Sequence, residues 1–358
     1  MQEQQFIPSK KFQLPKEGRV AWESPSNIAL VKYWGKYGEQ LPKNASISFT
    51  LSHCKTTTQL SFEKKDTIEN FSFEIYLDGK RTESFEPKIK KFFERVEVYL
   101  PFLKQYHFKI ETQNSFPHSS GIASSASGMS ALALCLLQLE RQADSAMTEE
   151  FFNKKASFLA RLGSGSAARS IQGNLVVWGK HKSVKNSSNL YGVAYDGLHD
   201  IFKEYQDTIL LVDRGEKQVS STVGHDLMHN HPFADQRFKQ ANENLEKLLP
   251  VLASGNLEEF IHIVEQEALS LHAMMMTSHP YFILMKPNTL QIINKIWEFR
   301  KSHNSKVCFT LDAGANVHVL YPKKEKEQVL DFIKNQLVVY CQKAMYLCDE
   351  VGSGAKSI

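Results

Sequence analysis

The alternation of apolar and polar residues predicts strands in both halves of the chain. Residues 47–52 and 56–62 alternate and are rich in β-branched residues, which is typical of two separate strands. Residues 71–85 alternate around Asp78-Gly79, a dipeptide that favours a tight hairpin turn. Further strands are expected at 106–116, 174–179 and 207–213, a strand–loop–strand at 306–322, and a buried strand or the start of an element at 27–34.

Helical periodicity separates these strands. Residues 87–100 place Ile89, Phe92, Phe93 and Val96 on one face, which predicts an amphipathic helix. A second helix is expected over 149–163, with Thr148 as N-cap and Gly163 as C-cap. Three more helices are expected at 127–141, 234–253 and 288–303. Because strands and helices mix in both halves, with several hairpins, the pattern indicates an α+β protein.

Length and composition indicate two domains. A chain of 358 residues is long enough for about two domains. The pattern changes after the polar stretch 183–192, which places a boundary near residue 205 and predicts domains 1–205 and 206–358, with residues 1–18 as an extension. The net charge of +4 is spread along the chain without a basic, aromatic-rich block, so no nucleic-acid partner is expected. A mild positive excess suits a small anionic substrate.

The cysteines and the N-terminus indicate the compartment. The five cysteines are far apart and include no CxxC pair, so neither a disulfide framework nor a structural metal site is expected. Residues 1–12 are polar and lack the apolar core of a signal peptide. No apolar run approaches the roughly 18 residues that a membrane span needs. We therefore expect a cytoplasmic protein that does not enter a membrane.

A serine-rich stretch, PHSSGIASSASG at 117–128, directly precedes the apolar helix. One interpretation is a flexible linker. The other is a phosphate site, because small residues admit a phosphate close to the backbone and the helix that follows presents free N–H groups. The hydroxyls of Ser124, Ser125 and Ser127 would add donors. No GK[ST] or GxSxG motif is present, so neither a Walker A loop nor a nucleophile elbow is indicated.

Three other stretches carry candidate chemistry. GSGSAAR at 163–169 is either a helix cap or a second anion site, in which Arg169 suits a carboxylate or phosphate. Asp312, in LDAGANV, is either a turn residue or a catalytic base. A carboxylate is costly to bury alone, so cationic partners such as Lys32 are expected near it. NIALVKYWGK at 27–36 is either core packing or a segment whose lysines face a polyanion.

Seven motifs together resemble the mevalonate diphosphate decarboxylases of the GHMP kinase superfamily. In chain order they are SPSNIALVKYWGK, PKNASISFTLS, GIASSASG, GSGSAARS, VSSTVG, LDAGANV and VGSGA, and they extend from about residue 20 to 355. NIALVKYWGK combined with GSGSAxR is specific to the decarboxylases, whereas the serine stretch alone indicates only the superfamily. The resemblance implies an N-terminal domain similar to ribosomal protein S5 domain 2, a ferredoxin-like C-terminal domain, and a homodimer.

The resemblance also implies a reaction and a set of residues. ATP with Mg²⁺ would phosphorylate the 3-hydroxyl of mevalonate 5-diphosphate, and loss of that phosphate with carbon dioxide would give isopentenyl diphosphate. The implied catalytic residues are Asp312, as the acid or base, with Lys32, and Arg169 at the substrate carboxylate. The implied substrate-binding residues are Asn27, Tyr33, Lys36, Ser164, Gly165, Ser166 and Ser221. The implied ATP-binding residues are Gly121, Ala123, Ser124, Ser125, Ser127 and Gly128.

The sequence departs from the family at two motifs. Residues 117–120 are Pro-His-Ser-Ser where Pro-Thr-Ala-Ala is usual, and Ala315 replaces the proline of DAGPN. Neither change touches a proposed chemical group. The same fold would also suit a phosphomevalonate decarboxylase, a mevalonate-type kinase or a non-catalytic metabolite sensor. Asp312 together with Arg169 argues against a pure kinase and against a sensor.

Overall fold

The computed structural model describes residues 3–9, 13–67, 69–117, 122–213 and 221–358. The strands are β1 (Glu17–Val31), β2 (Lys36–Tyr37), β3 (Leu41–Pro42), β4 (Ser46–Lys64), β5 (Ser72–Leu77), β6 (Lys80–Arg81), β7 (Tyr106–Asn114), β8 (Leu175–Trp178), β9 (Gly192–Ala194), β10 (Gln206–Leu210), β11 (Cys308–Thr310), β12 (Val317–Tyr321), β13 (Tyr346–Glu350) and β14 (Lys356–Ser357). The α-helices are α1 (Glu86–Val96), α2 (Ser124–Ala143), α3 (Glu149–Gly163), α4 (Asp200–Lys203), α5 (Ser221–Asp226), α6 (Ala234–Ser254), α7 (Leu257–Met276), α8 (Pro287–His303) and α9 (Lys326–Phe332).

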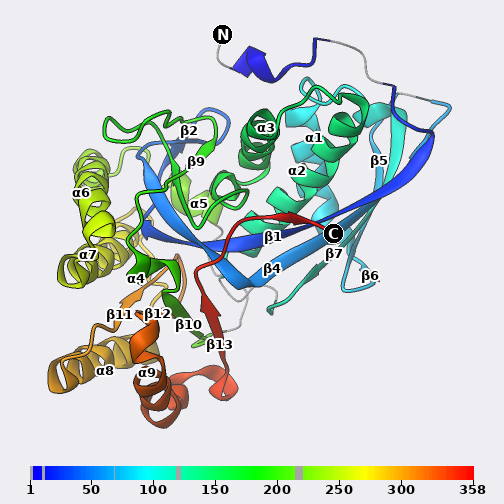
Figure 1. Cartoon of the computed structure of the whole chain (residues 1–358). Helices are drawn as coiled ribbons and strands as arrows, with labels where there is room; N and C mark the ends of the chain where they lie inside the picture. Colours follow the sequence, from blue (N-terminus) through cyan, green and yellow to red (C-terminus); the bar gives the residue numbers. More distant parts are fainter. Residues whose placement is uncertain (1–2, 10–12, 68, 118–121, 214–220) are drawn as a thin grey trace.

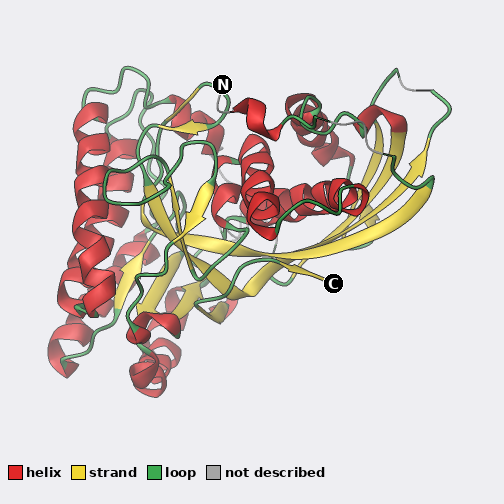
Figure 2. Cartoon of the chain, turned by 45° about the horizontal axis from the view of Figure 1, so that its top comes forward, coloured by secondary structure: helices red, strands yellow, loops and turns green. Residues whose placement is uncertain are grey.

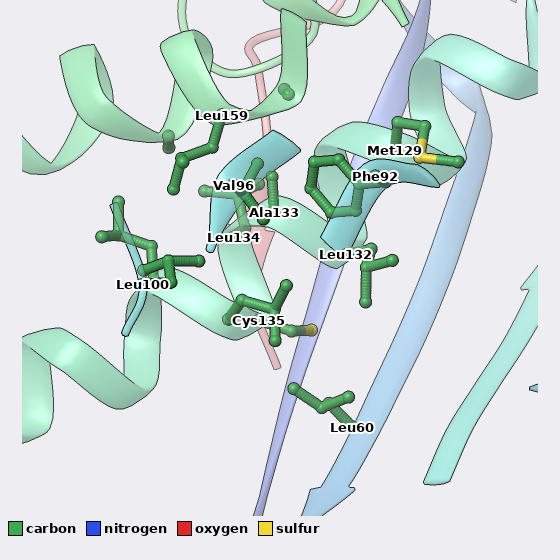
Figure 3. Close-up of a cluster of buried hydrophobic side chains, with 14 of the residues drawn as sticks. Leu60, Phe92, Val96, Leu100, Met129, Leu132, Ala133, Leu134, Cys135 and Leu159 are labelled. Atoms are coloured by element: carbon green, nitrogen blue, oxygen red, sulfur yellow. The ribbon is translucent and has the colours of Figure 1, made fainter. Parts of the chain in front are cut away.

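The first sheet is built around two long strands, β1 and β4. Its main path runs β14-β1-β4-β7-β5-β6, and β8 and β9 extend β4 beside it. Helices α1, α2 and α3 cover one face of this sheet (Figures 1 and 2). Between them lies an apolar core that includes Phe92 and Val96 of α1, Leu132 of α2 and Leu60 of β4 (Figure 3). The predicted apolar face of the 87–100 helix is therefore buried as expected.

The second sheet has four antiparallel strands in the order β11-β12-β10-β13. That order, with helices between β10 and β11 and between β12 and β13, is the ferredoxin-like arrangement expected for the C-terminal half. A further apolar cluster joins β1, β4 and β8 of the first sheet to β10 and to α6 and α7. The two halves therefore share buried surface, and the last strand, β14, returns to pair with β1. The division near residue 205 stays a prediction.

The structure differs from one predicted strand boundary and confirms two other local predictions. The two strands expected at 47–52 and 56–62 are one strand, β4, which continues through the polar residues between them. The predicted hairpin at Asp78-Gly79 is confirmed, since β5 and β6 pair across it and both turn residues have positive φ. The Thr148 N-cap is also confirmed, because its hydroxyl accepts the Phe151 N–H.

The expected glycine C-cap of α3 is wrong. Gly163 is the last helical residue, and Ser164 is the C-cap in an extended conformation. A Cβ at Gly163 would lie 2.7 Å from the sulfur of Met129. Close approach of α2 and α3, not a left-handed turn, therefore favours glycine at this position.

The N-terminal extension packs against the first half of the chain. Phe6 is fully buried and stacks on Phe158 of α3 with ring centroids 4.3 Å apart. Glu3 forms an ion pair with the buried Arg161 at 3.1 Å. None of the helices in the described part of the chain has both the length and the apolar composition of a membrane span.

Candidate active site

A cavity of about 700 Å³ lies where segments from both halves of the chain meet. The end of β1, the first turn of α2, the 3₁₀ helix Gly165–Arg169 and the loop after β11 all contribute to its wall. Most of the predicted site residues line it, namely Asn27, Lys32, Tyr33, Ala123, Ser124, Ser125, Gly128, Ser164, Gly165, Ser166, Arg169 and Asp312. The fold therefore brings together four sequence motifs that are far apart in the chain.

Lys32 and Asp312 form an ion pair in the cavity wall. The Lys32 ammonium lies 3.0 Å from Asp312 Oδ1 and donates a hydrogen bond to it. Lys32 follows β1 directly, and its position is set by a β-strand that is buried from Ser24 to Val31. Burial lowers the pKa of Lys32, whereas Asp312 and Glu267 act in the opposite direction. The expected cationic neighbour of Asp312 is thus confirmed.

Arg169 is a buried cation that lines the same cavity. Its Nε donates to Asn27 Oδ1 at 3.3 Å and its Nη1 donates to Ser46 Oγ at 2.5 Å. The guanidinium also lies 5.8 Å from the centre of the Trp178 ring. Burial lowers the pKa of Arg169 to about 10, and the nearby Asp312 favours its charged form. At neutral pH the arginine therefore remains charged, with few solvent contacts, and suits an anionic ligand in the cavity.

The first turn of α2 opens into the cavity. Its N-cap, Ala123, has a left-handed conformation with φ of 43°, and its side chain makes no capping hydrogen bond. The backbone N–H groups of a first helical turn have no partner within the helix, so this end attracts anions. Ser125 lies 3.4 Å, oxygen to oxygen, from Ser164 of the second small-residue loop. The two small-residue loops therefore form one continuous part of the wall.

Gly165 permits this wall to be closely packed. A Cβ there would lie 2.9 Å from the Tyr33 hydroxyl and 2.9 Å from the Trp178 ring. The Tyr33 ring in turn contacts Trp178 and His225, with centroids 4.7 Å and 4.3 Å away. Burial raises the pKa of Tyr33, so its hydroxyl stays protonated and can donate a hydrogen bond.

Sequence reasoning missed several lining residues, of which His225 is the most informative. His225, from α5, accepts the Gly35 N–H at its Nδ1 over 2.9 Å. Burial lowers the pKa of His225 to about 3, so the ring is neutral and its Nε2 carries the hydrogen. Trp34 and Thr56 also line the cavity. Apolar neighbours along the sequence masked Trp34, and no sequence pattern marks His225 because only the fold brings α5 to this wall.

Four predicted site residues are not in the described wall. Ser127 is fully buried on the inner face of α2, where its hydroxyl lies 2.6 Å from Thr56 Oγ1, so the expectation that it faces the phosphates is not met. Lys36 lies on β2 outside the lining. Ser221 begins α5, but its side chain lies outside the described set, and Gly121 lies outside the described residues altogether.

Comparison with known proteins identifies the family. Residues 24–189 match the model of the diphosphomevalonate decarboxylase-like N-terminal domain, and residues 208–352 match that of the mevalonate 5-diphosphate decarboxylase C-terminal domain. The diphosphomevalonate decarboxylase of Aspergillus fumigatus is 28% identical over 332 residues, which cover 88% of this chain and 80% of that protein. That of Saccharomyces cerevisiae is 28% identical over 327 residues, covering 87% and 79%.

Solved structures agree over nearly the whole length. The mevalonate diphosphate decarboxylase of Staphylococcus aureus superposes with a TM-score of 0.82 at 28% identity, covering 96% of this chain and 98% of that one. A structure of MDDEF in complex with MVAPP, AMPPCP and magnesium superposes with a TM-score of 0.81 at 28% identity, covering 96% and 99%. The motifs, the two-domain α+β fold and these full-length similarities agree, and the chain belongs to the diphosphomevalonate decarboxylase family.

Proposed function

We propose that this chain converts mevalonate 5-diphosphate and ATP to isopentenyl diphosphate, ADP, phosphate and carbon dioxide, using the cavity around Asp312. The observation that carries the proposal is the placement of Asp312, paired with Lys32, in one cavity with Arg169 and the first turn of α2. This combination offers a carboxylate for proton transfer, a cation for a carboxylate ligand and a helix end for phosphates. Membership of the family supports the same reaction.

The first step is phosphoryl transfer to a tertiary hydroxyl. The oxygen of the 3-hydroxyl attacks the terminal phosphorus of ATP while Asp312 accepts the hydroxyl proton, and ADP leaves. Lys32 keeps the carboxylate ionised beforehand, because a cation 3.0 Å away favours the charged form of an acid. The first turn of α2, with Ser124 and Ser125 in the cavity wall, holds the phosphates of the nucleotide.

The second step breaks a carbon–oxygen and a carbon–carbon bond. The 3-phosphate leaves with the electron pair of its bond to carbon, which generates positive character at that carbon. The substrate carboxylate then leaves as carbon dioxide, and the electron pair of its carbon–carbon bond forms the new double bond. Arg169 holds the carboxylate in line with the departing phosphate, and Asp312, after releasing its proton to solvent, stabilises the positive carbon as a carboxylate.

ATP and Mg²⁺ fit the residues that line the cavity. Mg²⁺ usually takes most of its ligands from phosphates and water and few from protein. The described residues contain no group of three or more His, Cys, Asp or Glu side chains arranged to hold a metal, which suits an ion carried by the nucleotide. Mg²⁺ would neutralise the phosphoryl group during its transfer. The complex of MDDEF with AMPPCP and magnesium supports this assignment for a protein of the same fold.

A single assay separates the proposed reaction from its alternatives. Purified protein is incubated with ATP, Mg²⁺ and either mevalonate, its 5-phosphate or its 5-diphosphate, and ADP and carbon dioxide are measured separately. We expect equal amounts of both products with the 5-diphosphate. ADP without carbon dioxide would indicate a kinase, both products with the 5-phosphate alone would indicate a phosphomevalonate decarboxylase, and neither product would indicate a sensor. Light scattering on the same sample tests the proposed homodimer.

A further inference from the structure

Two side chains of α7 form hydrogen bonds to the backbones of Lys32 and Asp312. Neither side chain has a part in the proposed chemistry. Glu267 Oε2 accepts the backbone N–H of Lys32 at 2.9 Å. His272, further along the same helix, makes a 3.1 Å hydrogen bond through its Nε2 to the backbone carbonyl of Asp312. Both side chains are buried, with 0% and 1% exposure. Helix α7 therefore contacts the backbones of both Lys32 and Asp312.

The Glu267 carboxylate is itself held from several directions. Arg237 of α6 donates to both of its oxygens, and the bond to Oε1 measures 2.9 Å. Asn244, also of α6, donates to Oε1 at 2.7 Å. Each oxygen therefore has two donors, and one of the four is the Lys32 N–H. Arg237 alone would be enough to neutralise the buried Glu267 carboxylate. The additional bond to the Lys32 N–H connects the Glu267–Arg237 ion pair to the residue that follows β1.

His272 acts as a neutral donor. Burial lowers the pKa of His272 to about 4, so the imidazole is uncharged at neutral pH. A backbone carbonyl only accepts hydrogen bonds, so the hydrogen of the neutral ring is on Nε2. The bond to Asp312 is therefore constant across the neutral pH range, and it fixes the backbone of a residue whose side chain is partly exposed in the cavity.

We propose that Glu267 and His272 are positioning residues, through which α7 sets the relative placement of the Lys32 ammonium and the Asp312 carboxylate. The inference rests on the proposed function. Lys32 and Asp312 come from opposite halves of the chain and lie in segments that follow strands, so regular sheet pairing does not fix them to each other. Displacement of a reacting group by about 1 Å costs up to about 100-fold in rate, so such anchors have a measurable effect.

Glu267 also acts on the charge of Lys32. The charged groups that act on the Lys32 ammonium are Asp312 and Glu267, which favour its protonated form, and Arg169, which opposes it. Neutralising Glu267 therefore lowers the pKa of Lys32 further. Loss of this charge therefore predicts a change in the pH profile that is separate from the placement of Lys32 through its backbone N–H.

The first test uses His272, whose replacement leaves no buried charge without a partner. His272→Leu removes the donor to Asp312, and His272→Gln keeps an N–H donor at a similar reach. We expect His272→Leu to lower kcat at least about tenfold with the KM for ATP unchanged, and His272→Gln to recover most of that loss. The matched control is His231→Leu, because His231 is also buried and makes the same 3.1 Å bond from Nε2 to a carbonyl, that of Met274, away from the cavity lining.

The second test compares two carboxylates of the same helix. Glu267→Gln keeps an oxygen that can accept the Lys32 N–H but removes the charge, so the alkaline limb of kcat/KM should move to lower pH. Glu265→Gln is the matched control, because Glu265 pairs with Arg300 and does not line the cavity. Urea unfolding of each variant measures its stability separately. If Glu267→Gln does not fold, the His272 series decides alone.

The outcomes separate this inference from the proposed function. Wild-type protein that releases no carbon dioxide from any of the three substrates overturns the proposed function and this inference with it. Active wild-type protein in which His272→Leu keeps its kcat, or loses no more than His231→Leu, overturns only the positioning role. A pH profile that is unchanged in folded Glu267→Gln overturns the effect of Glu267 on the charge of Lys32. Loss in His272→Leu with recovery in His272→Gln supports the proposal.

Discussion

The Lys32 ammonium lies 3.0 Å from the Asp312 carboxylate, yet Lys32 is 2% exposed and Asp312 31%. The lysine is therefore enclosed by protein while the acid remains accessible from the cavity. This asymmetry suits a pair in which the acid meets the substrate and the lysine maintains its charge. Because a buried charge without a partner is costly, the lysine also depends on the acid.

Asp312→Asn should lower both ADP release and carbon dioxide release by at least about 100-fold, the low end for loss of a positioned acid–base group. The side chain keeps its size but loses its basicity and negative charge. ATP should still bind, since the first turn of α2 is unchanged, and equilibrium binding of the nucleotide is the control. Near wild-type decarboxylation would show that Asp312 is only a turn residue. Loss of carbon dioxide release alone would restrict Asp312 to the second step.

Arg169→Lys should lower activity, although it keeps the positive charge. A lysine cannot reproduce the two directions in which the guanidinium donates, to Asn27 and Ser46, while still facing a carboxylate. We expect a loss of at least about tenfold in kcat/KM for the carboxylate-bearing substrate, equivalent to about 1.4 kcal/mol, with the KM for ATP little changed. A lysine variant with wild-type kinetics would remove Arg169 from the carboxylate role.

Ser125→Ala and Ser127→Ala should differ in which property they change. Ser125 is exposed in the cavity wall, so its replacement should raise the KM for ATP and leave the unfolding free energy unchanged. Ser127 is buried and its hydroxyl lies 2.6 Å from Thr56, so its replacement should cost about 1 kcal/mol of stability and leave the KM for ATP unchanged. Urea unfolding and ATP kinetics on both variants test this. The reverse assignment of effects would contradict the described orientation of α2.

Gly128→Ala should stabilise the free protein and weaken nucleotide binding. Gly128 lies within α2, and a Cβ there meets no described atom within 4 Å. Alanine is favoured over glycine in a helix interior by about 0.8–1.0 kcal/mol, so the unfolding free energy should rise. Because Gly128 also lines the cavity, the added methyl group should take space from the phosphates and raise the KM for ATP. A stabilised variant with unchanged ATP kinetics would place the nucleotide elsewhere.

Activity and stability should respond to alkaline pH in opposite directions at Lys32. Burial lowers its pKa below the ordinary 10.5. As the pH is raised, kcat/KM should therefore begin to fall at a pH below the usual lysine pKa, where the ammonium loses its proton. Between the folded pKa and 10.5 the unfolded chain binds more protons, so the stability contributed by Lys32 rises with pH. Urea unfolding of wild type and Lys32→Met from pH 7 upwards measures the difference. A wild-type stability that falls relative to Lys32→Met over that range would contradict the lowered pKa.

Local sequence determined those elements whose partners are close in the chain. The hairpin at Asp78-Gly79 depends on two residues that tolerate positive φ, and the start of α3 depends on the Thr148 hydroxyl, which accepts the N–H of Phe151 three residues later. A cationic neighbour of Asp312 was also predictable, because a partly buried carboxylate needs one, and the family resemblance pointed to Lys32.

The continuity of β4 was decided by a distant residue. The polar residues after position 51 indicated a break between two strands. In the structure, the N–H groups of Ser52, His53 and Cys54 donate to the carboxylate of Asp349, which belongs to β13. That carboxylate satisfies backbone donors where the polar pattern suggests a turn, so the chain stays extended. No local pattern can reveal a partner almost 300 residues away.

The sequence by itself determined which residue types this site contains, because phosphates, a carboxylate and a buried acid require small residues, an arginine and a cation. Only the tertiary structure decided which of them face the cavity. Successive residues of a helix point about 100° apart, so a helix that begins at Ser124 turns Ser125 toward the cavity and Ser127 into the core. His225, Glu267 and His272 reach the site or its supporting wall through packing of α5 and α7. Such contacts depend on the sum of long-range packing, which leaves no periodicity or motif in the chain.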